Sequence, residues 1–548
     1  MEWTKEQKEA IETKNCKLLV AAGAGSGKTA VLVERIIQKV IKDKIDIDKL
    51  LIVTFTNAAA SEMRERIQDA IYNNMDEHPE LNRQILLLNK ASIMTIDAFC
   101  KKVIKDNFFN LDLDPNLGIC DTTENELLKL EALDEVLEEL YESGSEIVDL
   151  YSDNKSDEGL RNLIVSIYNF IQSSPFPEKW LAEKCEMYNV TDKIDFGETV
   201  WGKELIKFAR TEILGTIEEL ETLEEDLKDN SEATNYLLTI QDDILQLKAL
   251  RINNVSWDDF YEEISKVKFS TLKRAPKVDE DTAEEVKAIR NKMKDKINKF
   301  LKDEVFISSS DEIFSDIKFL HNTLTEVSNA VISFGEKFKE KKRAKNLVDF
   351  SDMEHICLEL LNSNENVANM YKSQYEEILV DEYQDSNLIQ EFILNKISRG
   401  NIFMVGDVKQ SIYRFRQARP ELFLEKYNSY KLLDSASIND SKKILLFKNF
   451  RSNENIIDEC NFIFKNTMSK EVGEIDYDEN EYLKFGAEYY PQKGEEAEIH
   501  FIEKGLTEDE DLEDIEDDIE DKPQLEARVV SKRISELVRK FWNIRQEN

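Results

Sequence analysis

The chain has 548 residues, of which 73 are Lys or Arg and 112 are Asp or Glu, and its formal net charge is −39. This length is too great for one core and predicts three or four compact units. No run of about twenty apolar residues occurs, and the N-terminus lacks the basic start and apolar stretch of a signal peptide, so we expect a cytoplasmic protein without a membrane span. The cysteines form no CxxC pair, which argues against a disulfide framework or a zinc site.

The first region, residues 1–112, alternates short apolar segments such as KLLVAA, LLIVTFT and SIMTI with helical patterns, an order typical of a parallel α/β sheet. The first segment runs into a glycine-rich loop. Between a strand and a helix such a loop cradles phosphates with its backbone N–H groups, so we expect Lys28 to reach the outer phosphates of a nucleoside triphosphate and Thr29 to ligate its magnesium ion. An ordinary glycine turn is the alternative. The loop comprises Ala22, in place of the usual first glycine, and Gly23, Ala24, Gly25, Ser26, Gly27, Lys28 and Thr29.

The second region, residues 113–345, is predicted to be a helical insertion. Stretches such as TENELLKLEALDEVLEELYESG have apolar residues at spacings of three and four, few glycines and hardly any strand pattern. Part of the acidic excess lies here, from Glu218 to Asp229, where a solvated helix face explains it. The net charge therefore does not exclude a nucleic-acid partner, which needs only local basic surface.

Strand patterns return in residues 346–438 with EEILVDE and NIFMVGD. Asp381 and Glu382 stand at the end of the first of these strands, where an open parallel sheet places its ligand crevice. Asp381 can hold magnesium through water, and Glu382 can orient or deprotonate an attacking water. The alternative is a helix N-cap, where Asp is favoured. Together with the upstream phosphate loop, the pair favours a site of phosphoryl transfer.

The last region, residues 439–548, opens with KKILLFKNF and includes an acidic loop at 508–521 and a helix predicted from about Gln524 to Trp542. It is too short for a complete sheet domain.

Several motifs together resemble the UvrD/Rep-type helicases of superfamily 1. AGAGSGKT is followed by DEYQDS, then by MVGDVKQSIYRFRQA and NFRS. WTKEQKEAI resembles the family's Q motif, TFTNAAASEMRERI its motif Ia and TIDAFC its motif Ib. LVDFSDMEH ahead of DEYQDS is similar to the helicase–nuclease branch, and within that branch the chain most resembles the AddA proteins.

The resemblance implies a role for each matching residue at the nucleotide. Gln7 would read the adenine edge and Phe450 would stack on adenine. Gln410 would sense the γ-phosphate, and Arg451 would stabilise charge on the transferring phosphoryl group, an effect that can be worth several orders of magnitude in rate. The implied catalytic residues are Lys28, Glu382, Gln410 and Arg451, and the implied magnesium ligands are Thr29 and Asp381. One departure is Ala30, which stands where a basic residue often follows GKT.

The family's DNA contacts carry over onto this chain as well. Phe415 replaces the motif III tryptophan and lies between Arg414 and Arg416, a combination that suits stacking on bases and contact with phosphates. The alternative is that Tyr413 and Phe415 are core residues; we expect one of them to be core and Phe415 to face DNA. The resemblance adds the DNA-binding residues Thr54, Phe55, Thr56, Asn57, Thr95 and Arg416, although a TxT turn is otherwise an ordinary cap.

We therefore predict an α/β fold. A RecA-like P-loop parallel sheet, domain 1A, would come from residues 1–112 and 346–438, a 1B-like helical insertion from 113–345, and the incomplete start of a second RecA-like domain, 2A, from 439–548. No motif V, motif VI or nuclease domain is visible after NFRS, so we expect a fragment or a truncated product.

The resemblance implies ATP- and Mg²⁺-dependent 3′ to 5′ translocation on single-stranded DNA and unwinding of double-stranded DNA. This activity would serve double-strand-break repair and recombination at the bacterial nucleoid, together with a partner protein of the AddB type. Two alternatives stay open: a truncated ATP- and DNA-binding module without unwinding, and a P-loop enzyme acting on a small substrate.

Overall fold

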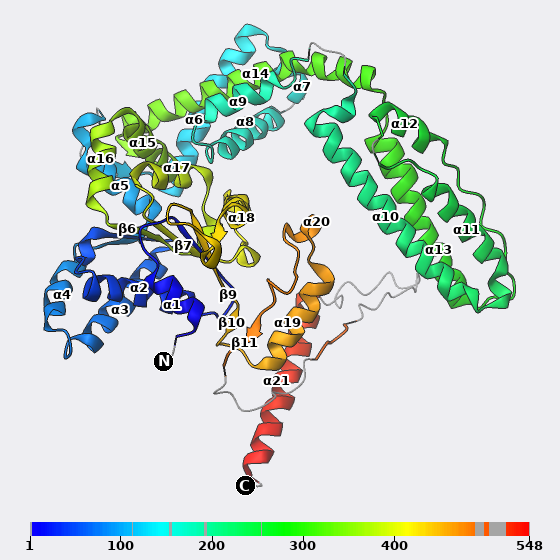
Figure 1. Ribbon diagram of the computed structural model, residues 1–548. Coiled ribbons are helices and arrows are strands. Elements are labelled where there is room, and N and C mark those ends of the chain that lie inside the picture. Colours follow the sequence, from blue (N-terminus) through cyan, green and yellow to red (C-terminus); the bar gives the residue numbers. More distant parts are fainter. Residues whose placement is uncertain are drawn as a thin grey trace, which may run out of the picture.

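A seven-stranded parallel β-sheet lies at the centre of the structure (Figure 1). The computed structural model describes residues 3–111, 113–114, 116–152, 156–190, 194–253, 255–487, 498–502 and 522–546. The strand order is β3-β2-β6-β7-β1-β9-β8, and every neighbouring pair is parallel. The strands are β1 (Leu18–Ala22), β2 (Leu50–Thr54), β3 (Ser92–Thr95), β6 (Glu377–Val380), β7 (Ile402–Gly406), β8 (Lys431–Leu432) and β9 (Lys442–Leu446). The predicted α/β class with a parallel sheet is confirmed.

Helices cover both faces of this sheet. Successive strand residues point to opposite faces, so that Leu18 and Val20 pack in one core while Leu19 packs in the other. Because both faces are buried, the strands read as continuous apolar runs. The first face carries α1 (Lys5–Glu12), α2 (Lys28–Lys42), α3 (Asn57–Asn74) and α4 (Asn82–Leu88). The second carries α5 (Ile96–Asp106), α15 (Phe350–Ser363), α16 (Glu365–Gln374), α17 (Leu388–Ile397) and α18 (Pro420–Ser429).

Strand β9 belongs to the first sheet, and this corrects the boundary drawn at residue 438. Its residues pair with β1 from Leu18↔Lys442 to Ala22↔Leu446. The segment KKILLF has a clear strand pattern, but a strand pattern does not say which neighbour the strand joins. The proposed second domain therefore has to begin after β9, and its identity stays a prediction.

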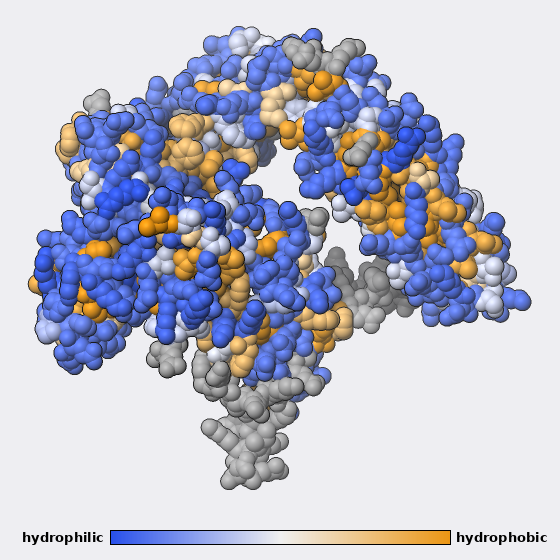
Figure 2. All heavy atoms as spheres, in the orientation of Figure 1, coloured by the Kyte–Doolittle hydropathy of each residue, from blue (hydrophilic) through white to orange (hydrophobic). Residues whose placement is uncertain are grey.

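Helices occupy the described chain from Thr122 to Ala344 and form two bundles (Figure 1). Near the sheet, α6 (Thr122–Ser143), α7 (Glu146–Tyr151), α8 (Glu158–Ile171) and α9 (Pro177–Glu186) share a core with the second half of α14. Farther out lies a bundle that we call the arm, built from α10 (Val200–Lys228), α11 (Thr234–Lys248), α12 (Trp257–Lys266) and α13 (Glu280–Lys294). The 35-residue α14 (Ser310–Ala344) contributes to both cores. Figure 2 shows the arm standing apart from the sheet across an open space, with hydrophobic residues gathered between its helices.

A buried ion cluster joins the end of α14 to α15. The Lys342 ammonium is 2.7 Å from Asp349 and 2.5 Å from Asp352, and it lies 4.0 Å from the centre of the Phe338 ring. Beside it, β4 (Gly118–Ile119) pairs with β5 (Leu347–Val348), so both ends of the insertion meet at one place. These contacts fix the insertion to the sheet domain.

After β9 the chain leaves the large sheet. There, β10 (Lys448–Asn449) pairs with β11 (Lys484–Phe485), and the helices are α19 (Glu454–Thr467), α20 (Lys470–Gly473) and α21 (Lys522–Gln546). The helix predicted from Gln524 to Trp542 is confirmed as α21, whereas the acidic loop predicted at 508–521 lies outside the described residues. In the part of the chain that the structure describes, no helix has the length and apolar character that crossing a membrane requires.

Candidate nucleotide site

The glycine-rich loop links the end of β1 to the start of α2. Gly25 and Gly27 have φ angles of +70° and +83°, a conformation that L side chains rarely adopt. Gly27 is the N-cap of α2 and provides no side-chain cap, so the first N–H groups of the helix stay available to an anion. Ala22 lies within β1 without a positive φ, which explains why a residue other than glycine is tolerated there.

Lys28 joins two groups that are far away in the sequence. Its ammonium lies 3.1 Å from Glu382 and 3.4 Å from the side-chain oxygen of Gln410. The Gln410 amide in turn donates to Asp407 over 2.8 Å. The structure thus brings together three predicted catalytic residues, from the ends of β1, β6 and β7.

Asp381 and Glu382 follow β6 directly. Glu382 has a left-handed φ of +49°, and its backbone N–H donates to Asp381 at 3.1 Å. It precedes a single helical turn, Tyr383–Asp385, but its side chain makes no capping hydrogen bond, which disfavours the N-cap interpretation. Burial, and then the neighbouring Glu382 carboxylate, raise the pKa of Asp381 to about 6. A buried carboxylate beside a second one favours a cation.

The residues present fit ATP with Mg²⁺. Ser26 Oγ is buried in the loop and has no hydrogen-bond partner among the described residues, as expected of a group that faces a phosphate. Asp385 Oδ1 is orphaned in the same way beside the DEYQDS turn. Thr29, at the start of α2, and Asp381, at the end of β6, supply the hard oxygen ligands that magnesium prefers.

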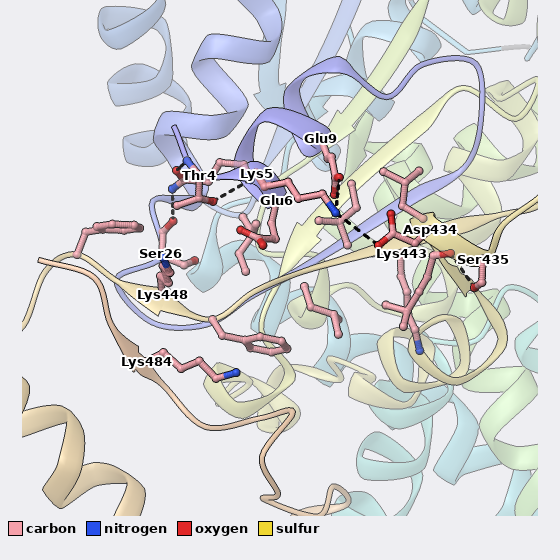
Figure 3. A pocket seen from close by; sticks show the side chains of 18 residues that line it. Thr4, Lys5, Glu6, Glu9, Ser26, Asp434, Ser435, Lys443, Lys448 and Lys484 are labelled. Atoms are coloured by element: carbon pink, nitrogen blue, oxygen red, sulfur yellow. Dashed lines mark hydrogen bonds and ion pairs between the residues drawn. The ribbon is translucent and has the colours of Figure 1, made fainter. Parts of the chain in front are cut away.

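A pocket of about 440 Å³ lies next to the loop, between α1 and the segment after β9. Gln7 and Phe450, the two residues predicted to contact adenine, both line it. Gln7 donates to the Ser26 carbonyl at 3.0 Å and accepts from the Thr4 N–H at 3.0 Å, so it also holds the loop to α1. Figure 3 shows Thr4 and Ser26 close together, with Lys484 on a separate strand of the pocket wall.

The NFRS segment packs directly on the phosphate loop. The Asn449 amide donates to the Ala24 carbonyl at 2.9 Å, and the N–H of Phe450 donates to the Gly25 carbonyl at 2.8 Å. A Cβ on Gly25 would lie 2.7 Å from the Asn449 side chain. The N–H of Arg451 donates to Asn449 Oδ1 at 2.8 Å, while the Arg451 side chain is exposed.

An aromatic cluster lies on the surface beyond this site. The rings of Phe55 and Tyr413 are 4.6 Å apart, and those of Tyr413 and Phe415 are 5.8 Å apart. The Arg416 guanidinium lies 5.8 Å from the Phe415 ring centre. Phe415 is 74% exposed whereas Tyr413 is half-buried, the division that the sequence led us to expect.

The threonines predicted to bind DNA bond to the protein backbone. Thr54 is buried and donates to the Thr56 carbonyl at 3.1 Å. Thr56 and Thr95 cap α3 and α5, where their hydroxyls accept from the helix N–H groups. Only Thr56 and Asn57 are exposed, so the DNA role of Thr54 and Thr95 stays a prediction.

Three further residues shape the site and were missed from the sequence. Gln384 is buried; it accepts from the N–H of Asp407 at 3.0 Å and donates to Glu382 at 2.9 Å. Lys409 lies 3.0 Å from Asp407 and 2.5 Å from Glu481. Gly406 could have hinted at Gln384, since a Cβ there would lie 2.2 Å from its side-chain oxygen. No sequence feature marks Glu481.

With this geometry in place, the chain can be compared with known proteins. The family described as UvrD/REP helicase N-terminal domain matches residues 3–431. The chain belongs to the UvrD/REP helicase family. This membership agrees with the predicted resemblance and with the parallel sheet that carries the phosphate loop.

Similar curated UvrD/REP proteins include three that are named as the A subunit of an ATP-dependent helicase/nuclease. The one from Acetivibrio thermocellus is 45% identical, covering 98% of this chain and 46% of that protein. Those from Ruminiclostridium cellulolyticum and Clostridium novyi are each 44% identical over 98% of this chain, and cover 46% and 45% of their own lengths. The chain therefore spans about half the length of these relatives.

Proposed function

We propose that this chain forms the ATP-hydrolysing core of a DNA helicase that moves 3′ to 5′ on single-stranded DNA. It would act in the bacterial cytoplasm, in double-strand-break repair and recombination, as part of a helicase–nuclease complex with a partner of the AddB type. The observation that carries the proposal is the contact of Lys28 with both Glu382 and Gln410. One cation thereby links the phosphate loop, the predicted base and the predicted γ-phosphate sensor.

Lys28 neutralises Glu382 in this structure and holds it at the end of β6. When ATP binds, its phosphates compete for Lys28, and Glu382 becomes free to accept a proton from the attacking water. Gln384 keeps Glu382 oriented through its 2.9 Å hydrogen bond. Magnesium, held by Thr29 and Asp381, would neutralise charge on the phosphates.

The link from hydrolysis to DNA follows from the position of motif III. Gln410 contacts Lys28, and five residues later Phe415 stands exposed on the surface, in the same aromatic cluster as Phe55. A change at Gln410 on loss of the γ-phosphate can therefore reach the aromatic cluster through a short, continuous segment. This is how the site would couple ATP hydrolysis to movement along a strand.

Steady-state ATP turnover and nucleotide binding test the proposal in the wild-type chain, in Lys28→Ala and in Glu382→Gln. We expect Glu382→Gln to bind MgATP like the wild type and to lose about 10²- to 10⁴-fold in turnover, the usual contribution of a general base. Lys28→Ala should lose both properties. Equal turnover in the wild type and Lys28→Ala would reject the proposed site.

The fact that the chain spans about half of its relatives' length favours one second candidate, an ATP- and DNA-binding module without unwinding. The same assays separate the two. Nucleotide binding without turnover in the wild type would support the module, and a chain extended through the remaining length of the relatives would then be expected to restore turnover.

A further inference from the structure

A second pocket, far from the nucleotide site, lies in the arm. It has a volume of about 340 Å³ and lies between α11, α13 and the segment 269–274 that precedes α13. Figure 1 shows these helices at the far side of the molecule from α1 and α2, which flank the phosphate loop. The lining residues are Tyr236, Phe269, Ser270, Thr271, Leu272, Lys273, Arg274, Lys287, Arg290, Asn291 and Lys294.

The walls of this pocket are held in place by buried contacts. Arg290 is buried; it donates to Asp243 at 2.5 Å and 3.1 Å and to the Ser270 carbonyl at 2.5 Å. From the other side, the Asn235 amide donates to the Arg274 carbonyl at 2.8 Å. The segment 269–274 is thus pinned to both helices by its backbone. Its side chains are left to face the pocket and the solvent.

The charge of the lining is unusual for this chain. Acidic residues outnumber basic ones by 112 to 73 overall, yet no Asp or Glu is among the described residues that line this pocket, whereas five basic side chains are. Asp243 neutralises Arg290, and the other four cations are Lys273, Arg274, Lys287 and Lys294. Positions 287, 291 and 294 follow one another at helical spacing and lie on one face of α13. Cations gathered in this way repel each other until an anion enters.

We propose that this pocket binds phosphate groups, and that their source is the backbone of DNA held by the arm. Lysine and arginine are the side chains that contact phosphate, and Thr271 and Asn291 add neutral hydrogen-bonding groups. The lining has no deep apolar floor or ring stack for a base, so contact with the backbone requires no particular sequence. The DNA source rests on the proposed helicase function, whereas the phosphate chemistry rests on the lining alone.

The test compares two triple variants of the full 548-residue chain. K273Q/R274Q/K287Q removes three pocket cations. K203Q/K207Q/K228Q removes three exposed lysines from α10, in the same arm, and is the matched control. Both remove the same charge, so a difference between them reports on place and not on net charge. Equilibrium binding is measured for a fluorescent duplex with a single-stranded tail, without nucleotide, at several salt concentrations.

We expect the pocket variant to bind the tailed duplex at least about tenfold more weakly than the control. Its salt dependence should also be shallower by about 0.9 in logarithmic slope for each lost contact with B-form DNA. Equal affinity and equal slope for the two variants would overturn the proposal. If instead inorganic tripolyphosphate binds the wild type but not the pocket variant, while DNA binding is equal, the pocket takes free polyphosphate and the DNA source is wrong. A wild-type chain that binds no DNA at all would reject the proposed function, and tripolyphosphate binding would still test the pocket.

Discussion

Phe415 carries the proposed contact between the motor and a DNA base. It is 74% exposed, its ring lies 5.8 Å from that of Tyr413, and the Arg416 guanidinium lies 5.8 Å from the Phe415 ring centre. An exposed ring held from one side by a second ring offers its other face for stacking, and stacking of this kind is worth about 1 to 3 kcal/mol per base.

Phe415→Ala should therefore weaken binding of an oligothymidine by roughly five- to 150-fold, and leave ATP turnover without DNA unchanged. Phe319, which is 75% exposed on α14, provides the matched control, since Phe319→Ala removes an equally exposed ring elsewhere. Fluorescence anisotropy measures the binding. An affinity for Phe415→Ala equal to that of the control would remove Phe415 from the DNA path.

Glu354 makes the stability of the sheet domain depend on pH. It is buried on α15 and accepts from Gln390 at 2.8 Å and from Asn387 at 3.4 Å. Burial, and then the nearby Asp97, raise its pKa from 4.5 to about 7. Between these two values the folded state holds a proton that the unfolded state has released. The free energy of unfolding therefore falls as pH rises through this window, by up to about 1.4 kcal/mol per pH unit.

Glu354→Gln removes this dependence, because glutamine stays neutral and can still accept a hydrogen bond from Gln390. We expect the variant to have a higher thermal midpoint than the wild type at pH 8 and little or no advantage at pH 5. Glu359→Gln, an exposed position on the same helix, should show no such difference. A gain for Glu354→Gln that is larger at pH 5 than at pH 8 would contradict the assigned sign.

At this scale the sequence predicted the residues whose chemistry is local. Lys28, Asp381 and Glu382 follow strands that can be recognised from their apolar runs, so their meeting at one sheet edge could be expected. Gln384, Lys409 and Glu481 could not be found in this way, because their importance depends on a partner brought close by the fold.

Among the elements, the ion pair between Lys409 and Glu481 joins the turn after β7 to the segment before β11. Glu481 is buried and also accepts from the Tyr427 hydroxyl. Lys409 keeps a second contact, with Asp407, whose carboxylate also accepts from the Gln410 amide. The pair thereby connects the predicted γ-phosphate sensor to the last region of the chain.

A double-mutant cycle with Lys409→Met and Glu481→Gln measures this connection. Each single change leaves a buried charge without one of its partners and should destabilise the protein by about 3 kcal/mol, whereas the double change should cost less than the sum, with a coupling of about 0.5 to 3 kcal/mol. Urea unfolding monitored by tryptophan fluorescence gives the four free energies. Strict additivity would show that the two side chains act independently.

The elements also show where sequence patterns lose information. Apolar periodicity located the sheet strands and the long helices of the insertion, because burial on one or two faces leaves a repeat in the sequence. The placement of β9 beside β1 was not predictable, since the pairing of parallel strands depends on the whole sheet and on no feature of KKILLF itself.

For the whole molecule, the net charge of −39 predicted little about partners. The basic pocket on the arm arises from residues between Tyr236 and Lys294 that fold against one another, and it is hidden in a sequence in which acidic residues dominate. Family membership follows from the match over residues 3–431, whereas the activity of a chain that spans about half of its relatives has to be measured.

The most direct test of the account is the ratio of ATP turnover with saturating single-stranded DNA to turnover without DNA. A motor core that couples Lys28, Glu382 and Gln410 to the aromatic cluster predicts a rise of about tenfold or more, absent in Lys28→Ala. Turnover that is the same with and without DNA would contradict the account, and would favour a P-loop enzyme that acts on a small substrate.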